Sequence, residues 1–154
     1  MMGGRIKIVP ARYCHVGPIA RRMREIDVEE CAAFGRTPKQ ALRMGIAYSE
    51  KSWTALVDGR PEAMFGSVVF SILSGEAAPW FLGTDEVYRH GRELLMWGPG
   101  LIDRLCDSRM TLRNLVSCRN TRAIRLLRRW GFKIGGEVIT SAGVEFFPFE
   151  KVPG

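Results

Sequence analysis

Residues 120–133 of this chain read Asn-Thr-Arg-Ala-Ile-Arg-Leu-Leu-Arg-Arg-Trp-Gly-Phe-Lys, and this stretch decides the fold. Asn120 is a favourable helix N-cap, because its side-chain oxygen can accept hydrogen bonds from the free N–H groups of the first turn. Apolar residues then recur at helical spacing, at Ala123, Ile124 and Leu127. Gly131 predicts a left-handed C-cap, and Phe132 after it begins a strand. Since residues 111–118 also have a strand pattern, the stretch predicts one strand–helix–strand corner of an α/β domain.

Outside this corner, strand and helix patterns alternate along the chain. Strands are expected over Arg5–Arg12, Trp53–Val57, Ala63–Ser71, Pro79–Gly83, Glu137–Thr140 and Val144–Phe149. Helices are expected over Val16–Phe34 and Thr37–Glu50. A third is expected to begin with Thr84 as its N-cap and to be kinked or broken at Pro99. Thr37 and Gln40 have the spacing of a capping box, and Gly59 predicts the positive φ of a hairpin turn.

The spacing of Asn120, Ala123, Gly131 and Phe132 after a strand resembles the late helix of the GNAT N-acetyltransferase superfamily. In that superfamily the helix lines one side of the acyl-coenzyme A site, so the resemblance implies that Asn120 contacts such a cofactor. The order of the other elements is similar over nearly the whole chain. The resemblance therefore implies a GNAT-like α/β fold over residues 1–154, with a mixed central sheet of about six or seven strands flanked by about three or four helices.

A second stretch, Pro79–Arg89, is informative together with the Asn120 helix. The two resemble a family of small phage proteins that includes the internal virion protein of T7-like short-tailed phages. This resemblance implies a phage or prophage protein that acts in virion assembly or is packaged in the particle. It also implies other virion proteins as partners, and the host cytoplasm as the compartment.

Composition restricts the remaining possibilities. The formal net charge of +7 favours polyanionic partners, although a solvated basic surface explains it equally well. The four cysteines are far apart and no secretory signal is visible, so reduced thiols in a cytosolic protein are expected. The two histidines have no metal-site spacing, and no apolar run approaches the ~18 residues of a membrane span.

The residues that acetyl transfer requires are incomplete in this sequence. In the superfamily, the cofactor's pyrophosphate is held by an Arg/Gln-x-x-Gly-x-Gly/Ala turn after the central strand, and residues 84–96 do not fit that pattern. Asp85 and Glu86 place negative charge where phosphate would dock. Basic and glycine character is retained at another spacing, and with Asn120 it gives the candidate cofactor-binding residues Arg89, Gly91 and Arg92.

The candidate catalytic groups are also missing. Many relatives have a tyrosine that protonates the leaving thiolate seven residues after the asparagine, and Leu127 occupies that position here. The strand Pro79–Gly83 contains no carboxylate that could serve as general base, and Glu76 is expected in the loop before it. A conventional acetyltransferase is therefore in doubt.

The same helix carries a second candidate site. Arg122, Arg125 and Arg129 stand three or four residues apart, so they share one helical face and could bind an acidic partner together, or simply be solvated. Three functions stay open: a non-catalytic phage protein with a degenerate acyl-coenzyme A site, an active acetyl-coenzyme A-dependent N-acetyltransferase with an atypical pyrophosphate loop, and a small nucleic-acid-binding module.

Overall fold

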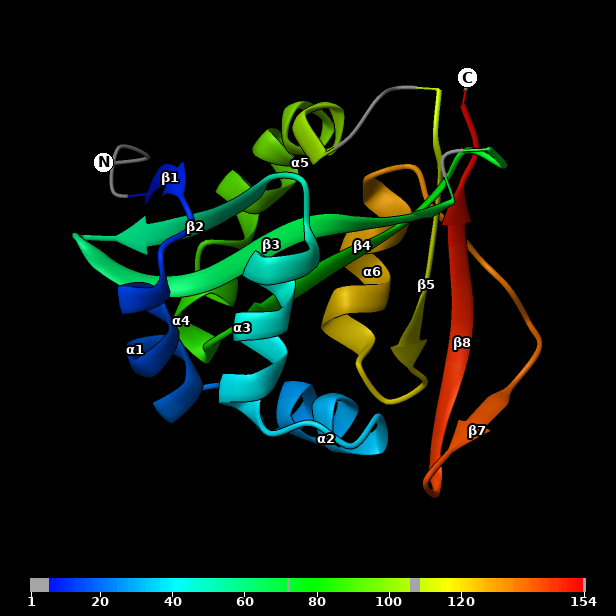
Figure 1. The fold of residues 1–154 in the computed structure, drawn as a ribbon, viewed down its shortest axis with the longest axis horizontal. Helices are drawn as coiled ribbons and strands as arrows, with labels where there is room; N and C mark the ends of the chain where they lie inside the picture. Colours follow the sequence, from blue (N-terminus) through cyan, green and yellow to red (C-terminus); the bar gives the residue numbers. More distant parts are fainter. Residues whose placement is uncertain (1–5, 72, 106–108, 154) are drawn as a thin grey trace.

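The computed structural model describes residues 6–71, 73–105 and 109–153. It contains an eight-stranded sheet with the strand order β1-β2-β3-β4-β5-β8-β6, and β7 also pairs with β8. The strands are β1 (Ile6–Pro10), β2 (Ser52–Val57), β3 (Arg60–Ser71), β4 (Glu76–Gly83), β5 (Thr111–Ser117), β6 (Lys133–Ile134), β7 (Ile139–Ser141) and β8 (Val144–Lys151). All neighbouring strands are antiparallel except β4 and β5, which are parallel, so the sheet is mixed (Figure 1).

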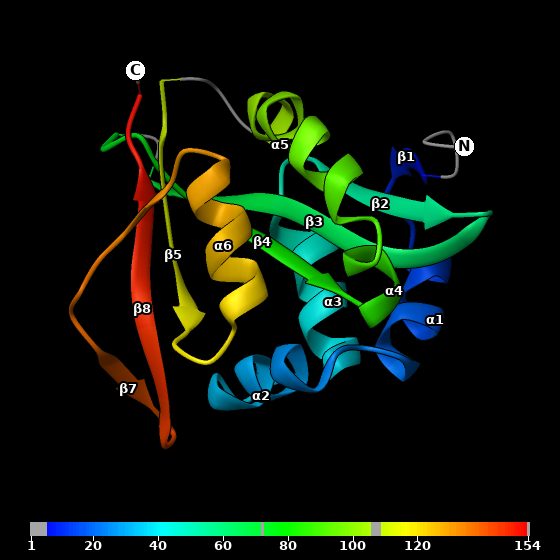
Figure 2. The ribbon, with the colours of Figure 1, turned by 180° about the vertical axis from the view of Figure 1, so that it is seen from behind.

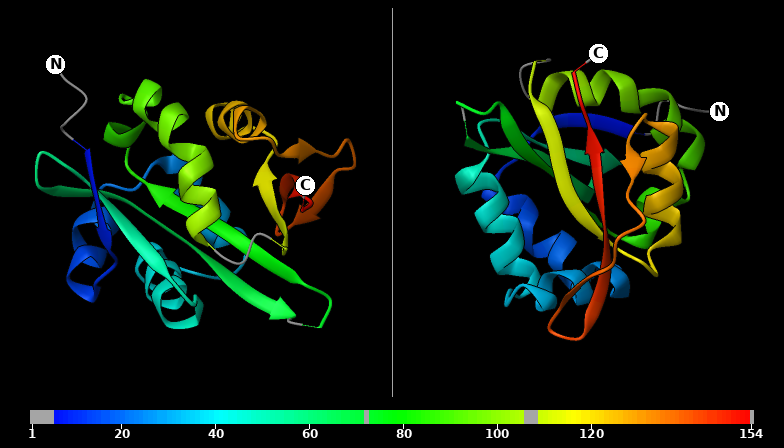
Figure 3. Two further views of the ribbon diagram at one scale, coloured as in Figure 1. Left: turned by 90° about the horizontal axis from the view of Figure 1, so that it is seen from above. Right: turned by 90° about the vertical axis from the view of Figure 1, so that its right-hand side faces the viewer.

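Helices cover both faces of the sheet (Figure 3). They are α1 (Val16–Arg21), α2 (Glu25–Ala33), α3 (Pro38–Tyr48), α4 (Asp85–Tyr88), α5 (Gly91–Leu105) and α6 (Thr121–Arg129), with the short 3-10 helix η2 (Tyr13–His15) before α1. The first three pack on one face and the last three on the other (Figure 3).

The alternation of side chains along β4 fills both layers of the core. Trp80 points to α3, where a Cβ atom on Gly45 would lie 2.5 Å from its ring, so only glycine permits this approach. Phe81 points to the opposite face and meets the Trp130 ring edge-on, with 6.5 Å between the ring centroids. The two neighbouring residues thereby join the sheet to helices on opposite sides.

Four local signals at helix ends and turns are confirmed. The Thr37 hydroxyl accepts from the Gln40 N–H at 3.2 Å, and the Gln40 side chain accepts from the Thr37 N–H at 2.9 Å. The Asn120 side chain caps α6 by accepting from the Ala123 N–H at 3.4 Å. Gly59 and Gly131 have φ values of 82° and 93°, which an L side chain rarely adopts.

The single long helix expected over Val16–Phe34 is wrong, because residues 22–24 interrupt it. The Arg24 N–H donates to the Gly83 carbonyl at 3.0 Å, and Met23 forms an isolated antiparallel bridge with Thr84. Backbone groups that a continuous helix would use are therefore bonded to the end of β4. This division adds a helix to the number expected.

Two other features differ from expectation. Of the kink or break expected at Pro99, the break is excluded, since α5 continues through this residue. Glu76 is the first residue of β4 rather than part of a loop. The mixed sheet with helices on both faces is confirmed, and it has more strands than expected because the short β6 and β7 both pair with β8.

Two further observations concern the thiols and membranes. Cys14, Cys31 and Cys118 are free thiols, while Cys106 lies outside the described residues. Within the described ranges, no helix is both long and apolar enough to cross a membrane.

Candidate functional site

The two parallel strands at the centre of the sheet separate soon after they meet, and we call the opening between them the fork. β4 and β5 pair only at Glu76 with Thr111 and at Ala77 with Leu112. Beyond these pairs the strands diverge, with α6 over one side of the opening and α2 at its far end (Figure 2). Pro79 explains where the pairing stops, because it lacks the N–H that would donate to β5 in the next step of a parallel ladder.

The side chain of Asn114 occupies the point of divergence. In a continuing ladder the Leu115 N–H would donate to the Pro79 carbonyl. Instead, the Asn114 Oδ1 accepts from the Leu115 N–H at 2.8 Å, and its Nδ2 donates to the Pro79 carbonyl at 2.8 Å. The amide therefore holds the strands one side chain apart while both backbone groups remain hydrogen-bonded.

The fork contains a cavity of about 500 Å³ that reaches both helical layers. Its walls are mostly apolar and aromatic, including Trp80, Phe81, Leu101, Val116, Leu126 and Trp130. Leu127, at the position where the resemblance implied a tyrosine, also lines it. The polar groups in the lining are few, and they come mainly from α2, β5 and the N-terminus of α6: Asp27, Glu30, Asn114 and Asn120.

Helix α2 supplies a carboxylate to each arm of the fork. The Asp27 Oδ2 accepts from the Gly83 N–H at the end of β4, at 3.0 Å. The Glu30 Oε2 accepts from the Ser117 N–H at the end of β5, at 2.8 Å. The two acids are three residues apart and therefore share one face of the helix. Amide groups that would be open to a ligand in the fork are thus satisfied by this chain's own side chains.

Arg24 and Asn120 complete this polar cluster. The buried Arg24 guanidinium donates to Asp27 Oδ1 at 3.3 Å and to Asn120 Oδ1 at 3.2 Å, and it lies 4.1 Å from the centre of the Tyr88 ring. The Asn120 Nδ2 donates to Glu30 Oε2 at 3.2 Å. Asn120 lines the cavity, and both ends of its amide are engaged within the protein.

Burial sets the protonation of these groups. Burial raises the pKa of the Asp27 carboxyl to about 7, and the charge of Arg24 opposes this only in part. Burial also raises the pKa of Glu30, against the hydrogen bonds from Ser117 and Asn120. It likewise raises the pKa of Tyr88, so that its hydroxyl stays protonated. A carboxyl with a pKa near neutrality, in a cavity, can exchange a proton with a ligand.

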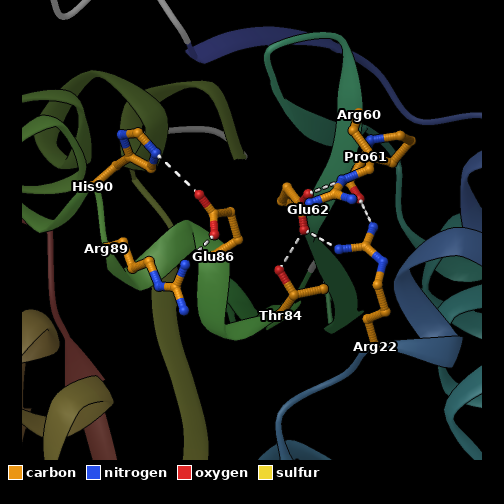
Figure 4. Close-up of polar contacts among 8 residues, drawn as sticks. All are labelled: Arg22, Arg60, Pro61, Glu62, Thr84, Glu86, Arg89 and His90. Atoms are coloured by element: carbon orange, nitrogen blue, oxygen red, sulfur yellow. Dashed lines mark hydrogen bonds and ion pairs between the residues drawn. The ribbon is translucent and has the colours of Figure 1, made fainter.

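The segment after β4 is fixed by a buried carboxylate on β3. Glu62 is fully buried and accepts hydrogen bonds from Thr84, Arg22 and Arg60, as Figure 4 shows. Burial alone would raise the pKa of Glu62, but these three hydrogen bonds outweigh it and hold the pKa below its usual value. The Thr84 hydroxyl was expected to cap the following helix; it donates to Glu62 at 2.6 Å instead.

The expected pyrophosphate loop is a turn of helix followed directly by a second helix. Glu86 in α4 pairs with Arg89 at 3.0 Å, and its carboxylate is 3.8 Å from the His90 ring (Figure 4). Glu93 lies 3.5 Å from the other side of His90. Two carboxylates therefore stand around the start of α5, where a phosphate would have to approach.

The candidate cofactor residues separate in space. Asn120 lines the cavity, whereas the other three candidates, Arg89, Gly91 and Arg92, do not. Arg89 and Arg92 are exposed, and the start of α5 at Gly91 has open space around it. The missed residues Arg24, Asp27, Glu30 and Asn114 had only one sequence signal, the spacing of two acids on one face of α2.

The arginine face of α6 is exposed as expected. Arg125 and Arg129, with Arg128 between them, line a groove of about 480 Å³ beside β8. Arg122 does not line this groove. Its positive charge instead acts on the pKa of the Tyr88 hydroxyl. Among the described residues, no cluster of histidine, cysteine and acidic side chains could hold a metal ion.

No protein-family model matches this sequence, and no curated protein does either. Solved structures do match over almost the whole chain. An acetyltransferase of the GNAT family from Bacillus anthracis has a TM-score of 0.69 at 7% identity, covering 99% of this chain and 98% of that one. A phosphinothricin acetyltransferase from Sinorhizobium meliloti, solved with acetyl-coenzyme A, has a TM-score of 0.71 at 17% identity, covering 97% and 89%.

A spermidine N-acetyltransferase from Vibrio cholerae, solved with coenzyme A and spermine, has a TM-score of 0.66 at 10% identity and covers 97% of this chain and 96% of that one. At these identities the likeness concerns the fold alone. The chain therefore has the GNAT acetyltransferase fold.

Proposed function

We propose that this chain is a phage or prophage protein of the GNAT fold whose acyl-coenzyme A site is degenerate, and that it acts in virion assembly through protein contacts. The observation that carries the proposal is that this chain's own side chains already bond the backbone groups along the fork. Asp27 and Glu30 accept hydrogen bonds from the N–H groups of Gly83 and Ser117, and Asn114 bonds the Pro79 carbonyl and the Leu115 N–H. A cofactor that paired with these strand edges would have to displace hydrogen bonds that are already made.

The region that should hold the pyrophosphate supports the same proposal. Asp85, Glu86 and Glu93 bring negative charge to α4 and to the start of α5. Each carboxylate near a phosphate in partly screened surroundings opposes binding by about 1 kcal/mol or more. The pyrophosphate end of acetyl-coenzyme A therefore does not fit this chain, although the fork has room for its acyl end.

The phage assignment is supported by the resemblance of Pro79–Arg89 and of the Asn120 helix to small phage proteins. An assembly role needs a surface for other virion proteins rather than a reactive centre, and the chain carries an exposed basic helix for that purpose. We propose that the protein works in the host cytoplasm and is either packaged in the particle or released before maturation.

Calorimetric titration with acetyl-coenzyme A and coenzyme A tests the degenerate site. We expect no heat of binding at micromolar ligand, with the spermidine N-acetyltransferase of Vibrio cholerae as positive control. Low-micromolar affinity would overturn this part of the proposal. The assembly role is tested separately, by mass spectrometry of purified particles and by the yield of particles from a phage in which the gene is deleted. Unchanged yield together with absence from assembling particles would refute it.

A second function is favoured by one specific observation, the Asp27 carboxyl with a pKa of about 7 in a cavity of about 500 Å³. Such a group could accept a proton from an amine, as an active N-acetyltransferase requires. Release of free coenzyme A thiol from acetyl-coenzyme A, in the presence of polyamines or lysine peptides, would establish this alternative. Its loss in Asp27→Asn would assign the base.

A further inference from the structure

Helix α6, beside the groove, concentrates arginines that have no carboxylate partner. Six other described arginines do have one: Arg22, Arg24, Arg60, Arg89, Arg113 and Arg119. Among the described residues no such pair is made by the α6 arginines: Arg122, Arg125, Arg128 and Arg129. Helix α6 itself contains no acidic residue. Its charge is therefore left for something outside the chain.

The groove combines this charge with an apolar floor. It is lined by three arginines, Arg125, Arg128 and Arg129, by Thr121, and by the apolar Ile124 and Phe147 of β8, which we call the floor. Ile124 and Phe147 both pack into the core beneath. The floor is therefore rigid, while the guanidinium groups above it remain free to turn toward a ligand.

We infer that this groove binds an acidic segment of a partner protein, in which carboxylates flank an apolar side chain. The inference rests on the proposed function, because it gives the chemistry of the protein partner that an assembly role requires. Planar guanidinium groups pair with carboxylates through two parallel hydrogen bonds. An apolar side chain between those carboxylates would cover the Ile124–Phe147 floor and remove it from water.

Nucleic acid fits the groove less well. A nine-residue helix is only about 14 Å long, so it spans few phosphates, whereas proteins that bind nucleic acid tightly contact about 6–10. The combination of three unpaired arginines with an apolar floor therefore favours a polypeptide.

Fluorescence anisotropy with a labelled synthetic peptide of alternating glutamate and leucine tests the inference on the full chain. We expect the peptide to bind, and the triple change Arg125→Glu, Arg128→Glu and Arg129→Glu to weaken binding about tenfold or more. The matched control changes three exposed basic residues near α3, away from the groove: Lys39→Glu, Arg43→Glu and Lys51→Glu. It alters the net charge equally and should bind like wild type.

Two further probes identify the ligand class. A peptide of alternating glutamate and serine has the same charge without apolar groups, and it should bind several-fold more weakly. Single-stranded oligothymidine should bind no better than that peptide. The inference is overturned if the glutamate–leucine peptide does not bind, if both triple variants lose binding equally, or if the oligonucleotide binds best.

Unfolding curves of both triple variants establish that they are folded. The coenzyme A titration concerns the fork and not the groove, so the two proposals fail independently. If coenzyme A binds, the proposal of a degenerate site fails but the peptide result is unaffected. If the peptide does not bind, the description of the fork is unaffected.

Discussion

Asn114 and Pro79 face each other across the fork, and the amide of one donates to the carbonyl of the other at 2.8 Å. Pro79 cannot continue the ladder, and Asn114 fills the position where the next inter-strand bond would form. The opening of the fork is thus built into the sequence at two positions, one on each strand.

Replacing Asn114 with leucine should destabilise the protein. The Leu115 N–H and the Pro79 carbonyl would lose their partners, at about 1–3 kcal/mol for each group that remains buried and unsatisfied. Asn114→Asp keeps an acceptor for Leu115 but sets its second oxygen against the Pro79 carbonyl, so it should also be less stable than wild type. Urea unfolding of the three proteins measures the order; equal stability of the leucine variant and wild type would remove Asn114 from this role.

Asp27 should give the stability a pH dependence of unusual sign for a carboxyl. Its pKa is about 7 in the folded protein and about 3.9 in an unfolded chain. Between these values the folded state holds a proton that the unfolded state has released. The contribution of Asp27 is therefore fully present below about pH 4 and is lost as the pH rises through about 7.

Asp27→Asn removes this titration while keeping an oxygen for the Gly83 N–H. Relative to wild type, the free energy of unfolding of the variant should rise between pH 4 and pH 8, at about 1.4 kcal/mol per unit of pKa shift. Urea unfolding at intervals across this range gives the difference. A difference that stays constant with pH would show that Asp27 is ionised throughout.

Gly98 and Gly100 in α5 form a matched pair. A Cβ atom at Gly98 would lie 1.8 Å from Trp130 Nε1, and that nitrogen is held by its hydrogen bond to the Leu94 carbonyl at 3.1 Å. Gly98→Ala should therefore lower the free energy of unfolding by about 1–3 kcal/mol.

Gly100→Ala is the control, since nothing lies within 4 Å of its Cβ position. Alanine has the higher helix propensity, so this variant should gain up to about 1 kcal/mol. Thermal unfolding of both proteins provides the test. Similar melting temperatures for the two would contradict the packing of Trp130 against α5.

Gly131 should tolerate no β-branched residue. Its φ of 93° is strained for any L side chain, and Lys151 Nζ lies 3.2 Å from the Cβ position. Gly131→Val is expected to cost about 1–3 kcal/mol, measured by thermal unfolding. Gly136→Val, at a position with open space and no positive φ, is the comparison and should cost less.

The elements that sequence predicts well are those with local causes. The capping box of Thr37 with Gln40 and the C-cap at Gly131 depend on residues a few positions apart, and both are present. The late helix and its strands follow from the same kind of pattern. Periodicity and caps therefore predicted a mixed α/β domain, whereas the GNAT-like arrangement was implied by the resemblance of the Asn120 helix.

The site could not be predicted in the same way. Asp27 meets Gly83 across 56 positions in the chain, and Glu30 meets Ser117 across 87. Nothing local distinguishes these acids from solvated ones on an ordinary helix. The break between α1 and α2 was missed for the same reason, because the Arg24 N–H finds its acceptor at the distant Gly83. Thr84 looked like a cap, and its hydroxyl is bonded to a glutamate 22 positions earlier.

The brief pairing of β4 with β5 has a mechanical consequence. The sheet consists of two halves that are joined only where Glu76 and Ala77 pair with Thr111 and Leu112. Helix α2 is hydrogen-bonded to the open edge of each half, through Asp27 and through Glu30. Because this helix is bonded to both edges, the two halves cannot move apart without breaking the hydrogen bond of Asp27 or that of Glu30. Motions that widen the gap should then be slow, and amide hydrogens at Gly83 and Ser117 should exchange with solvent only as α2 detaches.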